Sequence, residues 1–405
     1  MRTRYGVSPW IHQFPSSRRP DFPRFRGDHA TDVAIVGGGT TGCALAYACA
    51  SAGLRTVLLE GDRVGHGSSG RGSGLLSPDP GPWFRDVVAA HGLRSARRAF
   101  TAWRNGAREA AALIRRLEIK CALEPLDMIV AADRYDEKTL RREYEARVAA
   151  GFDLTWLTER QVKKLMNLDA PGAIRMRDAF SLDPYRASVG LVTAAAKRRT
   201  KIFERSAVRK IAFARKDVEI GLDGGTLRAR TVVIATGTAT ALFKPLRRHF
   251  KQREAYMAFT EPLPAAMRRQ LGDPSLALRD TRTPPRRLSW TRTDRLIPSG
   301  ADQAAASVRT REAVVVQRTG QLMYELLTMY PVISGLRPEY GWDASYGETS
   351  DGLMYIGPHR NYPRHLFALG STPHSATGAF VSARILLRAL QGRPENGDEV
   401  FAWAR

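Results

Sequence analysis

The sequence has few cysteines, comparatively few acidic residues and no long uninterrupted apolar run. Three cysteines occur in 405 residues, Cys43, Cys49 and Cys121, and their spacing is not that of a metal site. Because the first two lie in an apolar helical pattern, we expect buried thiols in a reducing compartment and place the protein in the cytoplasm. No stretch approaches the roughly 20 apolar residues that span a bilayer, and no signal-peptide core precedes the first strand. We therefore expect no transmembrane segment and no metal.

Basic residues outnumber acidic ones: the sequence has 63 Lys and Arg residues and 40 Asp and Glu residues, which gives a formal net charge of +23. Such a charge can attract nucleic acid, an acidic substrate or a membrane surface. A nucleic-acid stripe requires basic residues clustered on one element with interleaved aromatics. The arginines are instead dispersed in pairs, such as Arg97–Arg98 and Arg198–Arg199. We interpret the excess as solvated surface charge and do not expect nucleic acid as a partner.

The first chemical motif is a glycine turn between an apolar strand and a small-residue helix. The predicted strand 32–36 runs into Gly37, Gly39 and Gly42, and a helix over 43–52 follows. Gly37 allows a tight turn, Gly39 lets a pyrophosphate approach the backbone, and Gly42 lets helix and strand pack closely. The N-terminus of the helix presents free N–H groups and a positive dipole end to an anion.

An acidic residue completes this unit. The predicted strand 55–59 ends at Glu60, 18 residues after Gly42, close to the spacing of about 20 at which a carboxylate binds adenosine ribose hydroxyls. Strand, turn, helix and acid in this order indicate a bound ADP moiety. They do not separate NAD from FAD, so that choice depends on later segments.

Three later segments favour FAD. The loop Gly67–Gly74 directly follows Glu60 and can offer hydroxyls, N–H groups and a guanidinium to phosphates. An apolar strand, 232–235, ends in Thr236-Gly237, and the run 349–358 contains Asp351-Gly352-Leu353 ahead of a helix that opens near residue 375.

Together these segments resemble the D-amino-acid-oxidase-like family of FAD-dependent oxidoreductases, which includes glycine oxidase, sarcosine oxidase and gamma-glutamylputrescine oxidase. The resemblance covers nearly the whole chain and implies FAD as the cofactor. Carried over position by position, it gives these cofactor-binding candidates: Gly37, Gly39, Thr41, Gly42, Glu60, Ser68, Ser69, Arg71, Gly74, Leu75, Val208, Thr236, Gly237 and Gly378.

The order of the predicted elements, read with this resemblance, predicts an α/β fold. We expect a discontinuous, Rossmann-like FAD-binding domain and an inserted α+β substrate domain built on an antiparallel sheet, because FAD-type segments recur at the start, middle and end of the chain. The predicted FAD-binding domain comprises residues 1–120, 180–250 and 335–405, and the substrate domain comprises 121–179 and 251–334.

The resemblance also implies a reaction. Such enzymes oxidise a C–N bond of a small amine or amino acid by hydride transfer to flavin N5, which gives an imine that water hydrolyses. This predicts an amine or amino-acid oxidase or dehydrogenase of the EC 1.4 or 1.5 type. His374 and Tyr346 are the catalytic candidates. Because a substrate carboxylate requires an arginine, often with a tyrosine, Tyr256 and Arg292 are the substrate-binding candidates.

Two alternatives stay open. The positive charge motivates a tRNA-modifying flavin oxidoreductase of the same fold. The turn Ser371–Gly378 departs from the glycine-rich sequence usual in relatives, which motivates a flavoprotein whose redox site has drifted into a binding role.

We predict that the FAD is not covalently bound. No cysteine follows Cys121, so the cysteinyl linkage of sarcosine-oxidase-like members has no attachment point, and the position of His66 does not fit a histidyl linkage. Acid precipitation of the purified protein should release FAD into the supernatant, where its absorbance is measured. Flavin that stays with the precipitate would contradict this prediction.

Overall fold

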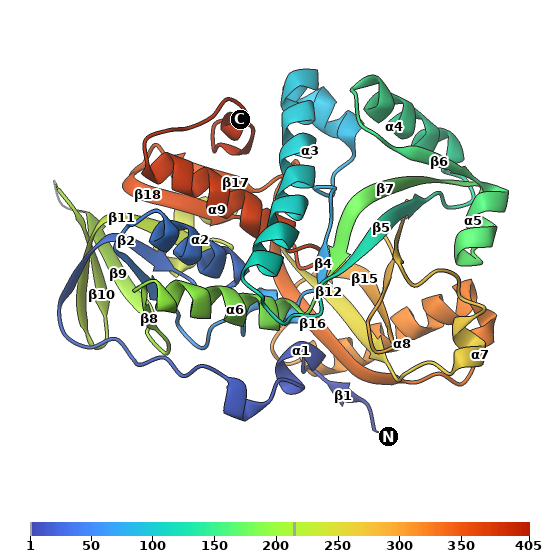
Figure 1. Cartoon of the computed structure of the whole chain (residues 1–405), viewed down its shortest axis with the longest axis horizontal. Coiled ribbons are helices and arrows are strands. Elements are labelled where there is room, and N and C mark those ends of the chain that lie inside the picture. Colours follow the sequence, from blue (N-terminus) through green and yellow to red (C-terminus); the bar gives the residue numbers. More distant parts are fainter. Residues whose placement is uncertain (1, 214–215) are drawn as a thin grey trace.

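The computed structural model describes residues 2–213 and 216–405, and two β-sheets occupy the two halves of the molecule (Figure 1). We call the first sheet the cofactor sheet. Its spatial order is β17 (Tyr355–His359), β18 (Tyr362–Leu369), β11 (Gly225–Gly237), β2 (His29–Val36), β3 (Thr56–Leu59) and β8 (Lys201–Phe203). In addition, β10 (Val218–Leu222) pairs with β11, and β9 (Val208–Phe213) pairs with β10. Its central strands are parallel, as the predicted Rossmann-like unit requires.

Both faces of the cofactor sheet are covered, which explains its nearly continuous apolar strands. Along β2, Val33 and Ile35 face the helices α2 (Thr40–Ser51), α6 (Pro184–Lys197) and α9 (Thr377–Leu390). Ala34 and Val36 face a second core. The glycine turn thus lies at the C-terminal edge of a sheet that is buried on both sides.

The second sheet, the substrate sheet, is mostly antiparallel, and its parallel pairs are β1–β16 and β13–β5. Its spatial order is β1 (Arg4–Tyr5), β16 (Pro338–Glu348), β12 (Lys251–Thr260), β15 (Leu296–Ala304), β14 (Arg287–Trp290), β13 (Leu276–Asp280), β5 (Glu124–Ala131), β7 (Gly172–Ser181) and β4 (Leu75–Leu76), with β6 (Thr155–Thr158) beside β7.

Helices surround this second half of the molecule. The long helix α3 (Phe84–Arg116) stands between the two sheets in Figure 1, and α8 (Arg311–Met329) packs on β12, β15 and β16. The remaining helices are α1 (Pro9–His12), α4 (Glu137–Ala149), α5 (Glu159–Met166) and α7 (Ala265–Arg268). The predicted fold class is confirmed: an α/β half with a Rossmann-like sheet adjoins an α+β half built on a mainly antiparallel sheet.

Several element boundaries differ from the sequence-based expectation. The helix expected from residue 43 begins at Thr40, inside the glycine motif. The strand expected at 232–235 is the last part of a longer strand, β11, which begins at Gly225. Helix α6 begins at Pro184, where Asp183 accepts the N–H of Arg186 and caps the helix.

The position of β16 bears on the domain boundaries. This strand lies in the predicted FAD-binding range 335–405, yet it pairs with β12 along nearly its whole length, from Lys251–Glu348 to Thr260–Pro338. We therefore propose that the last segment of the substrate domain extends to Glu348, and we retain the other boundaries as proposals.

Within the described part of the chain, no helix has the length and apolar character needed to cross a membrane.

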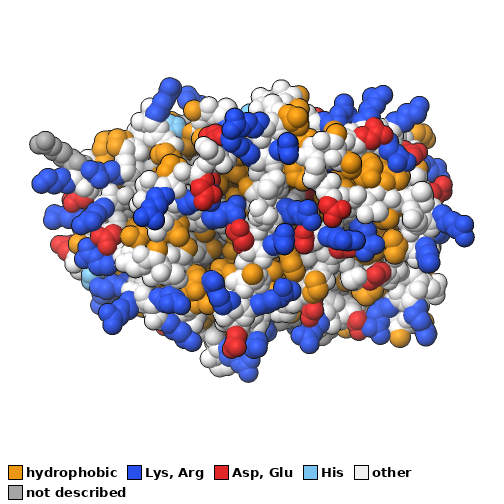
Figure 2. Space-filling view, turned by 45° about the horizontal axis from the view of Figure 1, so that its top comes forward, with side chains coloured by type: hydrophobic (Ala, Val, Ile, Leu, Met, Phe, Trp, Pro, Cys, Tyr) orange, Lys and Arg blue, Asp and Glu red, His pale blue; other side chains and the backbone are white. Residues whose placement is uncertain are grey.

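Basic side chains are scattered over the face shown in Figure 2, with acidic side chains interspersed among them, and they form no single stripe there. Across the described residues, groups of three or more metal-ligating side chains with suitable geometry are not found.

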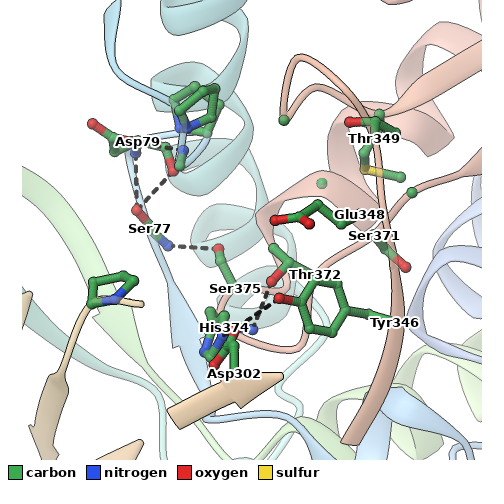
Figure 3. Close-up of a pocket in the computed structure, with 18 of the residues that line it drawn as sticks. Ser77, Asp79, Asp302, Tyr346, Glu348, Thr349, Ser371, Thr372, His374 and Ser375 are labelled. Carbon is green, nitrogen blue, oxygen red and sulfur yellow. Dashed lines mark hydrogen bonds and ion pairs between the residues drawn. The ribbon is translucent and has the colours of Figure 1, made fainter. Parts of the chain in front are cut away.

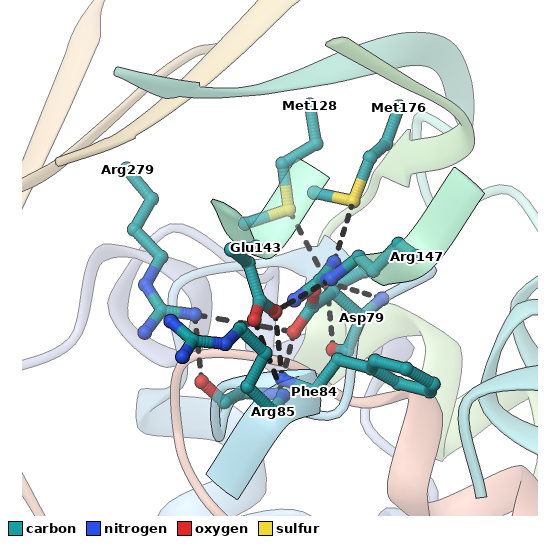
Figure 4. Close-up of polar contacts among 10 residues, drawn as sticks. Asp79, Phe84, Arg85, Met128, Glu143, Arg147, Met176 and Arg279 are labelled. Atoms are coloured by element: carbon teal, nitrogen blue, oxygen red, sulfur yellow. Dashed lines mark hydrogen bonds and ion pairs between the residues drawn. The ribbon is translucent and has the colours of Figure 1, made fainter. Parts of the chain in front are cut away.

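A buried ion network ties α3 and α4 to the loop after β4 (Figure 4). Arg147 bonds the carboxylate of Asp79 at 2.6 Å and that of Glu143 at 2.7 Å. Glu143 also accepts the N–H groups of Phe84 and Arg85, so its charge lies at the N-terminus of α3. These contacts fix the start of α3 beside the interior cavity described below.

Arg147→Met should destabilise the protein strongly. The variant leaves the Glu143 carboxylate buried without a cation and leaves Asp79 with only the more distant Arg279, at 3.9 Å. Such a loss typically costs about 3–5 kcal/mol. Urea denaturation monitored by circular dichroism would measure the loss. Arg142→Met, at an exposed position of the same helix, is the matched control and should change stability by less than about 0.5 kcal/mol.

Candidate functional site

The glycine turn after β2 is shaped by two close backbone approaches. Gly37 has φ +111°, and a Cβ there would lie 2.6 Å from the carbonyl oxygen of Ala235 at the end of β11. A Cβ at Gly42 would lie 1.9 Å from the carbonyl oxygen of Gly37. Both positions therefore require glycine, as predicted from the motif. Thr41 follows in the first turn of α2 and is buried.

The N-terminus of α2 fits a diphosphate. The Thr40 N–H bonds the hydroxyl of Ser69 at 2.8 Å, and a Cβ at Gly39 would lie 2.8 Å from that same oxygen. Glu60, at the end of β3, accepts the Gly38 N–H at 2.6 Å, and burial raises the pKa of its carboxyl. Helix N–H groups and a carboxylate therefore stand on either side of a side-chain-free turn, an arrangement that suits the ADP part of FAD.

The other members of the serine-arginine loop point elsewhere in this structure. Ser68 donates its hydroxyl to the carbonyl of Ser345 at 2.8 Å. Arg71 bonds the carbonyl and the carboxylate of Asp343 at 2.7 and 2.8 Å. Both contacts join the loop to β16, so their predicted role toward FAD remains a proposal.

The structure places Thr236, Gly237, Gly74, Leu75 and Val208, also cofactor candidates, in three different surroundings. Thr236 and Gly237 end β11 next to the glycine turn, and Gly370 N–H bonds the Gly237 carbonyl at 2.8 Å. Leu75 lines the cavity, and the carbonyl of its neighbour Gly74 accepts the Leu182 N–H. Val208 begins β9, packs against the second core of the cofactor sheet and lies outside the cavity lining.

A cavity of about 820 Å³ lies where the two sheets meet. Its lining includes Ser73 from the loop after β3, Leu75 from β4 and Gly378 from α9. The two catalytic candidates, His374 and Tyr346, line it as well. Its size is within the 300–1,000 Å³ range of sites that hold cofactors and small ligands. The structure thus brings both catalytic candidates to one cavity, and their catalytic role stays a prediction.

His374 belongs to a buried polar cluster at this cavity (Figure 3). Its Nε2 lies 2.7 Å from Asp302 Oδ2 on β15, and the Tyr346 hydroxyl donates to the same oxygen at 2.6 Å. Arg287 Nη1 lies 3.2 Å from His374 Nε2. The side chains of His374 and Asp302 are each 8% exposed. Asp302 therefore fixes the orientation of both catalytic candidates, and nothing in the sequence pattern had singled it out.

The electrostatics favour a neutral histidine. Burial and the Arg287 guanidinium lower the pKa of His374. Burial by itself would raise the pKa of the Asp302 carboxyl, but contacts with His374, Arg287 and Tyr346 outweigh burial and hold it below its usual range. Burial and the charge of Asp302 raise the pKa of Tyr346, so the phenol stays protonated. A neutral ring that donates from Nε2 to Asp302 has Nδ1 as its free acceptor.

The start of α9 also faces this cavity. Ser375 Oγ accepts the N–H groups of Thr377 and Ser77, at 3.2 and 3.1 Å. A Cβ at Gly378 would lie 2.5 Å from Met354 Sδ and 3.0 Å from the Trp103 ring. The glycine therefore lets α9 pack closely against α3, and its predicted role in binding FAD remains a proposal.

The Asp351 run forms another part of the cavity wall. Asp351 accepts bonds from both Arg405 Nε and Nη2, at 2.6 and 2.9 Å, and from His91 at 2.9 Å. The Arg405 guanidinium also stacks on the Tyr355 ring at 3.9 Å. The motif thus owes its shape to residues far from it in the sequence.

Two arginines that the sequence did not distinguish line the cavity. Arg279 on β13 and Arg287 on β14 are directly opposite partners in an antiparallel pair. Burial lowers the pKa of Arg279 to about 10, which leaves it charged at neutral pH, and burial also lowers the pKa of Arg287. Like charges placed directly opposite repel. Among the described residues, no carboxylate lies within ion-pairing distance of Arg287, and Arg279 Nε has no hydrogen-bond partner.

The two substrate-binding candidates taken from the sequence lie elsewhere. The Tyr256 hydroxyl is buried between Glu254 and Gln303. Arg292 is 72% exposed and 3.9 Å from Glu124. Neither lines the cavity. The hairpin that contains Arg279 and Arg287 also carries Arg282 and Arg286, and only the strand register tells which of these arginines reach the interior.

Known proteins resemble this chain along nearly its whole length. Residues 32–389 match the family described as FAD dependent oxidoreductase, DAO. Gamma-glutamylputrescine oxidoreductase of Escherichia coli is 24% identical over 371 residues, which cover 91% of this chain and 85% of that protein. Glycine oxidase of Bacillus licheniformis is 23% identical, covering 92% and 96%. The crystal structure of glycine oxidase from Geobacillus kaustophilus superimposes with a TM-score of 0.74 at 21% identity, covering 93% and 99%.

The His374 ring should stay neutral at pH values where an exposed histidine is half protonated, about 6.5. A lowered pKa means that protonation requires a lower pH than usual. In protein labelled with ¹³C-histidine, the Cε1 signal that disappears in His374→Gln should keep its chemical shift from about pH 7.5 to about pH 6.5. A titration midpoint at or above the usual value would contradict the buried, neutral state.

Proposed function

We propose that this chain, which belongs to the DAO family of FAD-dependent oxidoreductases, oxidises the C–N bond of an amino acid or an N-substituted amino acid. The family match confirms both the predicted resemblance and FAD as the cofactor. Bound FAD supplies the hydride acceptor of the reaction. The protein's own residues must then bind the substrate, orient its C–N bond and exclude water.

The pair formed by the buried Arg279 and the half-buried Arg287 carries this proposal. Two guanidiniums directly opposite each other at a cavity wall are costly unless an anion lies between them. A substrate carboxylate fits because a planar guanidinium can donate two parallel hydrogen bonds to it. Arg287 is the better candidate for direct contact, since Arg279 already donates to the Gly81 carbonyl at 2.7 Å and faces Asp79 at 3.9 Å.

The His374 cluster also supports an amino acid as the substrate. Asp302 holds His374 through Nε2 and holds Tyr346 through its hydroxyl, so both rings are fixed before a ligand enters. Asp302 also offsets the charge of Arg287. The cavity wall therefore carries a guanidinium and a carboxylate that are not ion-paired with each other, which suits a ligand that carries both an anionic and a cationic group. A zwitterionic amino acid has these groups.

Anaerobic mixing with paired substrates tests the reaction. Each amino acid is compared with the amine that lacks its carboxylate, for example N-methylglycine with dimethylamine, and bleaching of the flavin absorbance band reports reduction. We expect bleaching with at least one amino acid and much slower bleaching with its paired amine. Failure across a broad panel of amines and amino acids would contradict the proposal and favour a binding role.

Arg287→Met should lower the second-order rate constant of flavin reduction by the amino acid about 10- to 100-fold. Hydrogen bonds to charged groups contribute about 1.5–3 kcal/mol, which corresponds to this change in rate. The rate constant for the paired amine should fall much less, because the amine has no carboxylate that could bind Arg287. Arg309→Met, at an exposed position ahead of α8, is the matched control. Equal losses for both members of the substrate pair would contradict the assigned contact.

A further inference from the structure

The first residues of the chain are attached to the edge of the substrate sheet. We call residues 3–12 the N-terminal arm. Its strand β1 pairs in parallel with β16, the Gly6 N–H bonds the Gly341 carbonyl at 2.8 Å, and Thr3 Oγ donates to the Pro338 carbonyl at 2.8 Å. The arm thus begins on the half of the molecule opposite the glycine turn.

Beyond β1 the arm crosses to the cofactor loop, residues 65–74. Ser8 Oγ donates to the Gly70 carbonyl at 2.6 Å, and Trp10 Nε1 donates to the Gly72 carbonyl at 2.9 Å. Arg71 in turn donates to the Gly6 carbonyl at 3.1 Å. A Cβ at Gly70 would lie 3.1 Å from the Ile11 side chain, so the arm also packs against the loop.

Three successive carbonyls of the loop accept side-chain donors from outside it. Ser8 binds that of Gly70, Trp342 Nε1 on β16 binds that of Arg71 at 2.8 Å, and Trp10 binds that of Gly72. Each donor replaces a partner that a regular helix or strand would supply. The short 3₁₀ turn Ser68–Arg71 therefore depends on the arm and on β16 for its conformation.

The same loop touches both ends of the cofactor site. At one end Ser69 receives the Thr40 N–H at the start of α2. At the other, the Ser73 N–H bonds the Pro373 carbonyl at 2.9 Å, and Ser73 Oγ donates to the His374 carbonyl at 3.0 Å. A shift of the loop would therefore displace the diphosphate contact and the wall of the cavity together.

We propose that Ser8 and Trp10 are positioning residues for FAD, which hold the cofactor loop in its binding conformation without touching the cofactor. A protein whose binding-competent conformation is only partly populated binds with an affinity reduced by that fraction. Loss of the two donors would populate other loop conformations and weaken FAD binding. This proposal does not depend on which substrate the enzyme oxidises.

The test uses the full-length apoprotein of Ser8→Ala, Trp10→Phe and the double variant. FAD is titrated in, and quenching of its fluorescence gives the dissociation constant. We expect the double variant to raise that constant by about tenfold, the effect of losing two ordinary hydrogen bonds from the competent conformation. Ser8→Ala alone, which removes one oxygen atom, should give a smaller rise and provides a measurement if the tryptophan variant does not fold.

Thr3→Val is the matched control, because it removes a hydroxyl-to-carbonyl bond of the same arm that is made to β16 and not to the loop. It should leave the FAD dissociation constant unchanged. The melting temperature of each apoprotein is measured in parallel and should change no more in Ser8→Ala than in Thr3→Val. An unchanged FAD affinity in the double variant, or a weakened affinity that Thr3→Val reproduces, would overturn the proposal.

Discussion

One buried carboxylate, that of Asp343, forms ion pairs with both halves of the molecule and is 1% exposed. It receives Arg71 from the cofactor loop at 2.8 Å and Arg311 from α8 at 2.7 Å. A charge buried this deeply is tolerated only while its partners are in place. Its strand, β16, therefore serves both as the substrate sheet's second strand and as the support of the cofactor loop, and the cavity lies beside this junction.

Features that depend on neighbouring residues could be predicted from the sequence. The glycine turn and Glu60 are set by local backbone geometry, and the structure shows close contacts at Gly37 and Gly42 that a side chain would block. The fold class also followed, because the strand–helix–strand pattern and the later β-rich segments are visible as periodicity. Tyr346 and His374 could be named as candidates because both flank segments whose order matches the family, but their meeting at one cavity is known only from the structure.

Features that depend on strand register could not be predicted. Arg279 and Arg287 reach the cavity because β13 pairs with β14, whereas Arg292 lies in the turn after β14. The composition of a basic hairpin does not reveal this difference. Asp302 could not be predicted either, because it is a single acidic residue that belongs to no recognisable motif. The serine-arginine loop was recognised, but two of its side chains, Ser68 and Arg71, bind β16 instead of pointing at α2.

The contacts around the cofactor loop also constrain the order of events during synthesis. Arg71 and Asp343 are 272 residues apart, and Ser73 and His374 are 301 apart. The residues of the βαβ unit leave the ribosome early, and domains generally fold as units during synthesis. The loop that follows it has to wait for almost the entire remaining chain before its partners exist. The loop can therefore adopt its final conformation only late in synthesis. A ribosome-stalled fragment that ends before β16 should contain the residues of the glycine turn but lack the partners of the cofactor loop.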